Sequence, residues 1–532
     1  MFDLVIRNGT IIDGSGQARF AGDIGVSRER IRVVSPLPGS LAGRESIDAT
    51  GLCVSPGFID VHSHADRAIL SNPYCRSSLL QGITTVFAGQ CGGSQGPVND
   101  AMKERAAERA RRMGVEAPSM DWHSFGEFLG RVKDGGCGVN LGMFVGQGTV
   151  RNYVMGYEDR EPTIEELDKM RSLVRDAMKE GAFGLSAGRT YMPGRLAGRE
   201  EIVELCKQIA PSGGLYACHM LSEGDAIDGA LDELLYIARA SGARPHIVHA
   251  KVCGRRNWGK APAVLERVEQ AREDGLDLMF DVYPYNFAQI GTLRGIFTGV
   301  ASKLNIGELL SALRRDPEYA KQVARDAEEE MAKIDPVRLR NLPQRGVVWC
   351  QNTKEHEWKS LEEIASDLGI GLIPAVIWLG VENHLAVKTA LIMSDNEVEL
   401  FIRHPFSMIS TDAGTQDVLE DKSGAGHPRA FGAYPRVLGR YARDLSALPL
   451  EDAVRKMTSV PAARMGLGDR GLLKEGYFAD IVVFDRRTVA ETGSIDAPCE
   501  APVGIQYVLV NGSIAARDGE TTGERAGRVL SR

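Results

Sequence analysis

The sequence predicts an α/β protein in which a (β/α)8 TIM-like barrel carries a small β-domain formed by both ends of the chain. The middle of the chain alternates short apolar runs with helical patterns, and the eight runs are the number that such a barrel requires. Both ends instead carry β-type runs with turn signals. With 43% hydrophobic and 25% charged residues among 532, the composition is that of a globular protein with a full core.

The two ends predict one shared β-domain. Residues 3–12, 21–35 and 46–57 are β-type runs, and the pair Asn8-Gly9 predicts a turn between strands. Residues 469–485 and 504–520 have the same character and include a second Asn-Gly pair at Asn511-Gly512. We therefore expect residues 1–57 and 468–532 to pair with each other.

The middle of the chain, residues 58–467, predicts the barrel. Helical patterns at residues 163–181 and 229–242 lie between strand-like runs, as a parallel barrel demands. Polar, charge-rich residues at about 295–370 predict a helical insertion before the last strand. The eight predicted strands are residues 57–64, 82–91, 140–146, 182–188, 214–220, 245–251, 278–285 and 406–414.

Charge and composition exclude several classes of partner. A net charge of −8 argues against nucleic acid or an anionic membrane as the main partner. No stretch reaches the ~18 unbroken apolar residues of a membrane span, and the first residues lack a signal-type pattern, so we expect a cytoplasmic protein. The nine cysteines include no C-x-x-C pair, which argues against a disulfide framework.

The run SPGFIDVHSHAD, residues 55–66, holds two histidines one residue apart. Side chains alternate along a strand, so His62 and His64 face the same way and could converge on a metal. Backbone carbonyls or water could also satisfy such a pair. In a parallel barrel, however, catalytic groups project from the C-terminal ends of the strands, which is where this pair lies.

Four other strand-like runs end in residues that can complete a metal site. Nitrogen, sulfur and oxygen donors suit Zn²⁺, and a thiolate favours zinc over magnesium or calcium. Each residue alone could be a core residue, but together they predict a metal site. His246 is excluded because it would face away from the site. The four residues are Cys91, His219, His249 and Asp412.

At this point the sequence resembles a known family. Among the stretches that carry the resemblance are SPGFIDVHSHAD, ITTVFAGQCG, GLYACHM, HIVHAK, STDAG, GHPRAFGAYPRVLGRY and GYFADIVVFD. They resemble the N-acyl-D-amino-acid deacylases, or D-aminoacylases, of the amidohydrolase superfamily, over essentially the whole chain. The resemblance implies a metal-bearing barrel beside a β-sandwich built from both termini.

The resemblance also implies roles for the candidate ligands. Cys91, His219 and His249 match the tightly held zinc site of the family. His62, His64 and Asp412 match the positions around a second, weaker metal site, which Cys91 can share. Asp412 matches the catalytic acid/base. The amide carbonyl could be polarised by the metal or by an adjacent donor such as His64 or Tyr283, and we expect His64 to be catalytic.

Further residues match the group that binds the substrate. Lys251, Tyr283 and Arg429 match the family's binding site for the substrate carboxylate. Arg294 is an additional arginine, and Arg189 stands where the family more often has leucine. Either arginine could pair with an acidic substrate side chain, and the alternative is a surface arginine or an intramolecular salt bridge.

The expected function is zinc-dependent hydrolysis of the amide bond of N-acyl-D-amino acids, a small-molecule reaction that releases a carboxylate and a free D-amino acid. One alternative is a cyclic-amide hydrolase resembling dihydroorotases or hydantoinases. Another is a non-enzymatic binding protein on an inherited barrel. The preferred side chain, the number of metal ions, the oligomeric state and the role of the insertion stay open.

Overall fold

The computed structural model describes residues 1–113, 119–288, 291–292, 306–334, 342–384, 386–417 and 426–532. Parallel strands form a closed barrel, in which a β-bridge between Ser63 and Ala413 joins the first strand to the last. All eight predicted strands are present, which confirms the (β/α)8 barrel. In order around the barrel they are β6 (Phe58–Asp60), β7 (Ile83–Ala88), β8 (Asn140–Met143) continued by β9 (Val145–Gly146), β10 (Gly184–Gly188), β11 (Leu215–His219), β12 (Arg244–Ile247), β13 (Met279–Val282) and β17 (Ser407–Ile409).

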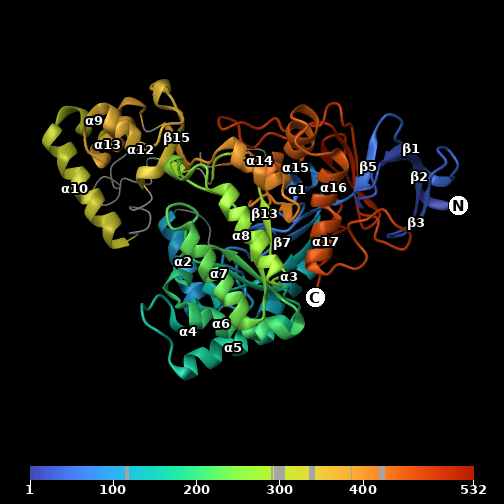
Figure 1. Cartoon of the computed structure of the whole chain (residues 1–532), viewed down its shortest axis with the longest axis horizontal. Coiled ribbons are helices and arrows are strands. Elements are labelled where there is room, and N and C mark those ends of the chain that lie inside the picture. The colour runs from blue at the N-terminus through green and yellow to red at the C-terminus, as the bar shows by residue number, and fades with distance from the viewer. Residues whose placement is uncertain (114–118, 289–290, 293–305, 335–341, 385, 418–425) are drawn as a thin grey trace.

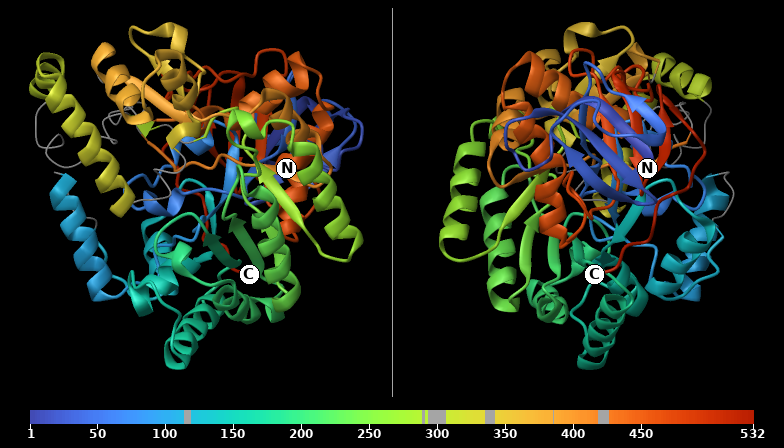
Figure 2. Two further views of the ribbon diagram at one scale, coloured as in Figure 1. Left: turned by 60° about the vertical axis from the view of Figure 1, so that its left-hand side comes forward. Right: turned by 90° about the vertical axis from the view of Figure 1, so that its right-hand side faces the viewer.

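Helices cover the outside of the barrel (Figures 1 and 2). Helix α5 (Ile164–Lys179) shows why they form where the sequence predicts them. Thr163 caps its first turn in a reciprocal capping box with Glu166, and Met170 and Val174 lie buried on one face. Further covering helices are α3 (Phe125–Gly135), α6 (Arg199–Ile209), α7 (Ile227–Ser241), α8 (Ala261–Glu273), α14 (Asp395–Arg403), α16 (Leu450–Met457) and α17 (Ser459–Met465).

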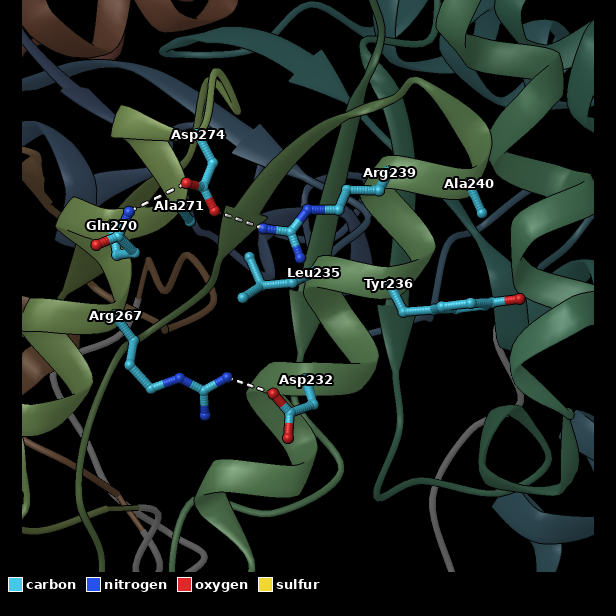
Figure 3. Close-up of a pocket in the computed structure, with 9 residues that line it drawn as sticks. All are labelled: Asp232, Leu235, Tyr236, Arg239, Ala240, Arg267, Gln270, Ala271 and Asp274. Atoms are coloured by element: carbon cyan, nitrogen blue, oxygen red, sulfur yellow. Dashed lines mark hydrogen bonds and ion pairs between the residues drawn. The ribbon is translucent and has the colours of Figure 1, made fainter.

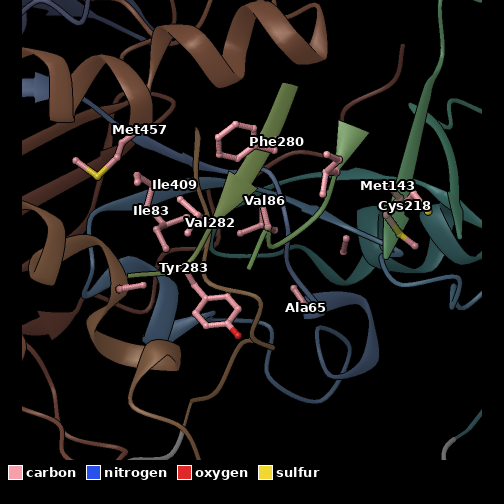
Figure 4. Close-up of a cluster of buried hydrophobic side chains, with 14 of the residues drawn as sticks. Ala65, Ile83, Val86, Met143, Cys218, Phe280, Val282, Tyr283, Ile409 and Met457 are labelled. Carbon is pink, nitrogen blue, oxygen red and sulfur yellow. The ribbon is translucent and has the colours of Figure 1, made fainter. Parts of the chain in front are cut away.

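The barrel strands are buried on both faces, as parallel strands under helices must be. Phe280, Val282 and Ile409 belong to the main hydrophobic cluster between strands and helices (Figure 4). A second cluster fills the barrel interior and includes Phe183 and Met408. These packed cores make the strands a rigid support for the residues that follow them.

The two ends of the chain form one nine-stranded sheet with its own hydrophobic core. Strand β5 from the N-terminal part pairs antiparallel with β18 from the C-terminal part. The expected β-sandwich of both termini is therefore built on a single sheet, although the boundaries at residues 57 and 467 stay predictions. Its strands are β1 (Phe2–Ile11), β2 (Phe20–Ser27), β3 (Arg30–Ser35), β4 (Gly43–Asp48), β5 (Cys53–Pro56), β18 (Ile481–Phe484), β19 (Ile505–Val510), β20 (Ser513–Arg517) and β21 (Glu520–Thr521).

The two Asn-Gly pairs have different outcomes. Asn511-Gly512 connects β19 to β20 with positive φ at both residues (49° and 84°), the hairpin turn that the sequence predicts. The turn predicted at Asn8-Gly9 is wrong, because both residues lie inside β1. There the pairing register with β2 shifts between Ile6 and Gly9, and Asn8 has a φ of 60°. The pair makes a β-bulge rather than a turn.

The last residues of the chain cross the N-terminal end of the barrel. The backbone N–H of Gly527 donates to Cys137 O, and that of Leu530 donates to Leu141 O. The Leu530 side chain packs against the cluster inside the barrel. The tail thereby connects the terminal sheet to the end of the barrel opposite the candidate site.

A smaller unit lies between β13 and β17, at the opposite end of the molecule from β1–β3 (Figure 1). It has its own hydrophobic core, and the limits predicted for the insertion stay a prediction. Among the described residues no single helix is long and apolar enough to span a membrane; α12 and α13 pass only as a pair bent by 90°. The elements of the unit are β14 (Gly291–Thr292), α9 (Ile306–Arg315), α10 (Pro317–Ile334), β15 (Arg345–Cys350), α12 (Leu361–Leu368), α13 (Leu372–Glu382) and β16 (Val387–Leu391).

Candidate metal centre

All six predicted ligands follow C-terminal ends of barrel strands and lie together at one mouth of the barrel. The backbone turns sharply at three of them, with φ of 53° at Cys91, 39° at His249 and 48° at Asp412. This left-handed conformation is uncommon for residues other than glycine, and it concentrates at functional sites where the surrounding structure enforces it.

The first group is centred on the Cys91 thiol. Its Sγ lies 3.6 Å from His219 Nδ1 and 3.4 Å from His249 Nε2. All three side chains are buried. Three donor atoms that converge in this way, one thiol sulfur and two imidazole nitrogens, form a cluster that can hold one metal ion.

The second group shares Cys91 with the first. His62 Nε2 lies 3.4 Å from Cys91 Sγ and 3.4 Å from Asp412 Oδ1, and His64 Nε2 lies 3.2 Å from the same carboxylate oxygen. The Nδ1 atoms of His62 and His64 are buried and have no hydrogen-bond partner within the described part of the chain. This group can hold a second ion.

The charges of these groups favour a cation. Although burial raises the pKa of Cys91, the imidazoles of His62 and His249 hold it well below its usual range. Although burial lowers the pKa of His62, the Cys91 thiolate and Asp281 raise it well above its ordinary value. Protons thus occupy the imidazoles that face a thiolate, and a divalent cation can replace them.

Two buried carboxylates that sequence reasoning did not assign support the ligands. Asp281 accepts hydrogen bonds from the His249 backbone N–H (3.0 Å) and from His246 Nε2 (2.9 Å). His246 therefore serves as a core residue, outside both groups. The sequence signal that could have identified Asp281 is its position two residues before Tyr283, on the same face of the strand. The second carboxylate, Glu223, lies in the loop after β11, where no periodicity marks it.

Three of the four predicted substrate-binding residues border the centre. Arg429 Nη1 lies 2.8 Å from Asp412 Oδ2, and its guanidinium lies 4.7 Å from the centre of the Tyr283 ring. Lys251 Nζ lies 5.5 Å from the same ring. Arg294 lies outside the described residues.

Arg189 makes an intramolecular ion pair, the alternative that the sequence left open. Its Nη2 lies 2.7 Å from Glu233 Oε1, and its Nη1 donates to Gly194 O. The side chain is 6% exposed. Arg189 therefore already has its partners within the chain.

A surface hollow of about 540 Å³ lies elsewhere, on the outer face between α7 and α8 (Figure 3). Ion pairs cross it, with Arg239 bound to Asp274 and Arg267 bound to Asp232. None of the candidate metal ligands lines this hollow.

Comparison with known families agrees with the fold. The pattern of the Amidohydrolase family matches residues 45–282 and 396–516. L-Hydantoinase from Arthrobacter aurescens shares only the fold, with a TM-score of 0.56 and 16% identity over all of both chains. The barrel with its metal-type cluster is thus that of an amidohydrolase.

Two enzymes of Alcaligenes xylosoxydans xylosoxydans are similar over nearly their full length. D-aminoacylase is 35% identical, covering 100% of this chain and 98% of the relative, and N-acyl-D-glutamate deacylase is 33% identical, covering 100% and 96%. A solved D-aminoacylase structure with a binuclear metal centre has a TM-score of 0.78 and 32% identity over all of both chains. The chain belongs to the N-acyl-D-amino-acid deacylase family.

Proposed function

We propose that this protein is a zinc-dependent deacylase that hydrolyses the amide bond of N-acyl-D-amino acids and releases a carboxylate and a free D-amino acid. The observation that carries the proposal is the Cys91 thiol within 3.6 Å of three imidazole nitrogens, beside the Asp412 carboxylate. A relative, the N-acyl-D-glutamate deacylase of Bordetella bronchiseptica, was solved with zinc and a phosphonate inhibitor; it is 29% identical with a TM-score of 0.75, and each chain is covered fully.

The spacing of the donors supports zinc. Tetrahedral zinc with Zn–S of about 2.3 Å and Zn–N of about 2.0–2.1 Å separates sulfur from nitrogen by about 3.5 Å. The Cys91 Sγ distances to His219 Nδ1 and His249 Nε2, 3.6 and 3.4 Å, bracket that value. When bound, zinc activates a water molecule at neutral pH and polarises the scissile carbonyl.

Asp412 is the proposed acid and base. Although burial raises its pKa, Arg429 and His249 hold it well below the usual range, so the carboxylate is ionised and can accept a proton. It takes the proton of the attacking water and delivers it to the amide nitrogen as the C–N bond breaks. His64, 3.2 Å from Asp412, lies where it can donate to the carbonyl oxygen.

Arg429, Tyr283 and Lys251 are proposed to bind the α-carboxylate of the substrate. An arginine fork recognises a carboxylate with two parallel hydrogen bonds. In this structure Arg429 faces Asp412 instead, so the substrate carboxylate competes with Asp412 for it. Anchoring the carboxylate fixes which face of the α-carbon meets the centre, which accounts for selection of one enantiomer.

The test is a screen of purified, metal-analysed protein against N-acetyl-D- and N-acetyl-L-amino acids with apolar and acidic side chains. We expect bound zinc and hydrolysis of D-substrates only. Hydrolysis of hydantoins or dihydroorotate with no turnover of linear substrates would overturn the proposal.

The variant Cys91→Ala tests the metal assignment. We expect it to lose zinc and activity together, because removal of the shared thiolate leaves both ligand groups incomplete. Elemental analysis and turnover of the same sample measure this. Wild-type turnover in a zinc-depleted Cys91→Ala sample would contradict the assignment.

A further inference from the structure

Glu223 contacts both halves of the proposed site. Its Oε1 lies 3.0 Å from His249 Nδ1 and 2.6 Å from Lys251 Nζ. The carboxylate side chain is 11% exposed, and Lys251 is 6% exposed. One buried carboxylate therefore links a candidate metal ligand to a candidate group for the substrate carboxylate.

When His249 binds the metal ion, its orientation decides which atom donates in each hydrogen bond. His249 Nε2 is the atom that faces Cys91, so Nδ1 carries the ring proton and donates it to Glu223. Lys251 Nζ lies within hydrogen-bond distance of Glu223 Oε1 (2.6 Å), His249 O (2.7 Å) and His249 Nδ1 (2.6 Å). Because Nδ1 of a ligating His249 is itself a donor to Glu223, the Lys251 N–H group nearest Nδ1 has no acceptor there and can serve the substrate carboxylate.

The surrounding loops hold Glu223 in place. Its backbone carbonyl accepts a hydrogen bond from the Cys253 N–H at 2.7 Å. Asn257 Nδ2 also donates to Asp225 Oδ1 at 2.9 Å, which ties the same two loops together beyond β11 and β12. The carboxylate is thus fixed before any ligand binds, as an orienting group must be.

We propose that Glu223 is a positioning residue that couples the metal centre to the binding site for the substrate carboxylate, by orienting His249 as a ligand and holding Lys251 at the mouth. This inference rests on the proposed function. A carboxylate that accepts the outer N–H of a ligating histidine fixes the ring and strengthens metal binding, and its loss typically weakens binding about 10–100-fold.

The test compares Glu223→Gln with the matched acid-to-amide control Asp228→Asn, an exposed position in the first turn of α7. The zinc dissociation constant is measured by chelator competition, and kcat and KM are measured on an N-acyl-D-amino acid. We expect Glu223→Gln to raise the zinc dissociation constant about 10–100-fold and also to raise KM, and Asp228→Asn to change each by less than about threefold.

Lys251→Met separates coupling from general damage. It should raise KM while leaving the zinc dissociation constant within about threefold of the wild-type value, because Glu223 remains to orient His249. If Glu223→Gln does not fold, Glu223→Asp carries the test, since the shorter side chain withdraws the carboxylate from both partners.

The outcomes distinguish the two proposals. A wild-type protein that binds no zinc or hydrolyses no N-acyl-D-amino acid contradicts the proposed function. Wild-type zinc binding and turnover, combined with a Glu223 variant whose zinc dissociation constant and KM match those of Asp228→Asn, overturns the role of Glu223 alone.

Discussion

The two ends of the barrel both bury charged side chains, but they satisfy them differently. At the C-terminal mouth, the rings of His62 and His64 face other ionisable groups: Asp412 Oδ1 lies within 3.4 Å of both, and Asp281 Oδ2 lies 3.6 Å from His62 Nδ1, next to the Cys91 thiolate. At the opposite end, Lys456 donates to His404 O and Ser407 Oγ, and Arg470 pairs with Asp480. Buried ionisable side chains that converge on one point thus mark the candidate metal centre, whereas buried charges that are paired one to one or hydrogen-bonded to the backbone stabilise the fold.

The variant Asp412→Asn is expected to have the largest effect and acts at the mouth. Since the amide cannot accept the proton, kcat should fall about 10²–10⁴-fold. The ion held by Cys91, His219 and His249 should be retained, because Asp412 belongs only to the second ligand group; steady-state kinetics and elemental analysis on one sample determine both. A loss below tenfold would remove Asp412 as the proton carrier.

At the opposite end, the variant Arg470→Met should affect stability instead of chemistry. It leaves Asp480 buried without its cation, which typically costs about 3–5 kcal/mol of unfolding free energy. Urea denaturation measures this, and kcat per folded molecule should be unchanged. A large drop in kcat of the folded fraction would mean that Arg470 also contributes to catalysis, and would contradict the distinction between the two ends of the barrel.

The tail beneath the barrel gives a smaller effect on stability. The variant Leu530→Ala should lower the free energy of unfolding by about 2 kcal/mol, because Leu530 packs against the interior cluster and is only partly buried. The exposed neighbour gives a control, Ser531→Ala, expected within about 0.5 kcal/mol of wild type. Equal midpoints for both variants would show that the tail adds no support.

Arg189 tests the comparison between the two ends of the barrel. It follows β10 at the C-terminal end, yet it is paired with Glu233 as the charges at the opposite end are paired. The variant Arg189→Ala should change the ratio of rates on N-acyl-D-glutamate and N-acyl-D-leucine by less than about twofold, or about 0.4 kcal/mol. Competition assays with both substrates measure that ratio. A tenfold shift would mean that Arg189 leaves Glu233 to meet the substrate.

Periodicity accounts for what the sequence predicted well. All eight barrel strands are apolar runs with helical patterns between them, and the six candidate ligands stand at strand ends, so strand direction alone brings them together. The turn at Asn511-Gly512 followed from the same local rules, whereas Asn8-Gly9 did not, because pairing with β2 accommodates Asn8 as a bulge.

What could not be predicted depends on contacts between loops. Glu223 meets His249 and Lys251 only because the loops after β11 and β12 are hydrogen-bonded, and nothing in the spacing of these residues reports that. The partner of Arg189 was equally hidden, since Glu233 lies on a helix 44 residues further along the chain.

The join between the first and last barrel strands has a kinetic consequence. Asp412 N–H donates to His62 O, and His64 N–H donates to Ala413 O, across a sequence separation of about 350 residues. Bringing such distant segments together carries a large entropic barrier and comes late when a chain folds. Because His62 and His64 meet Asp412 only across this seam, uptake of a metal ion by this second ligand group during refolding would report the moment at which the barrel closes.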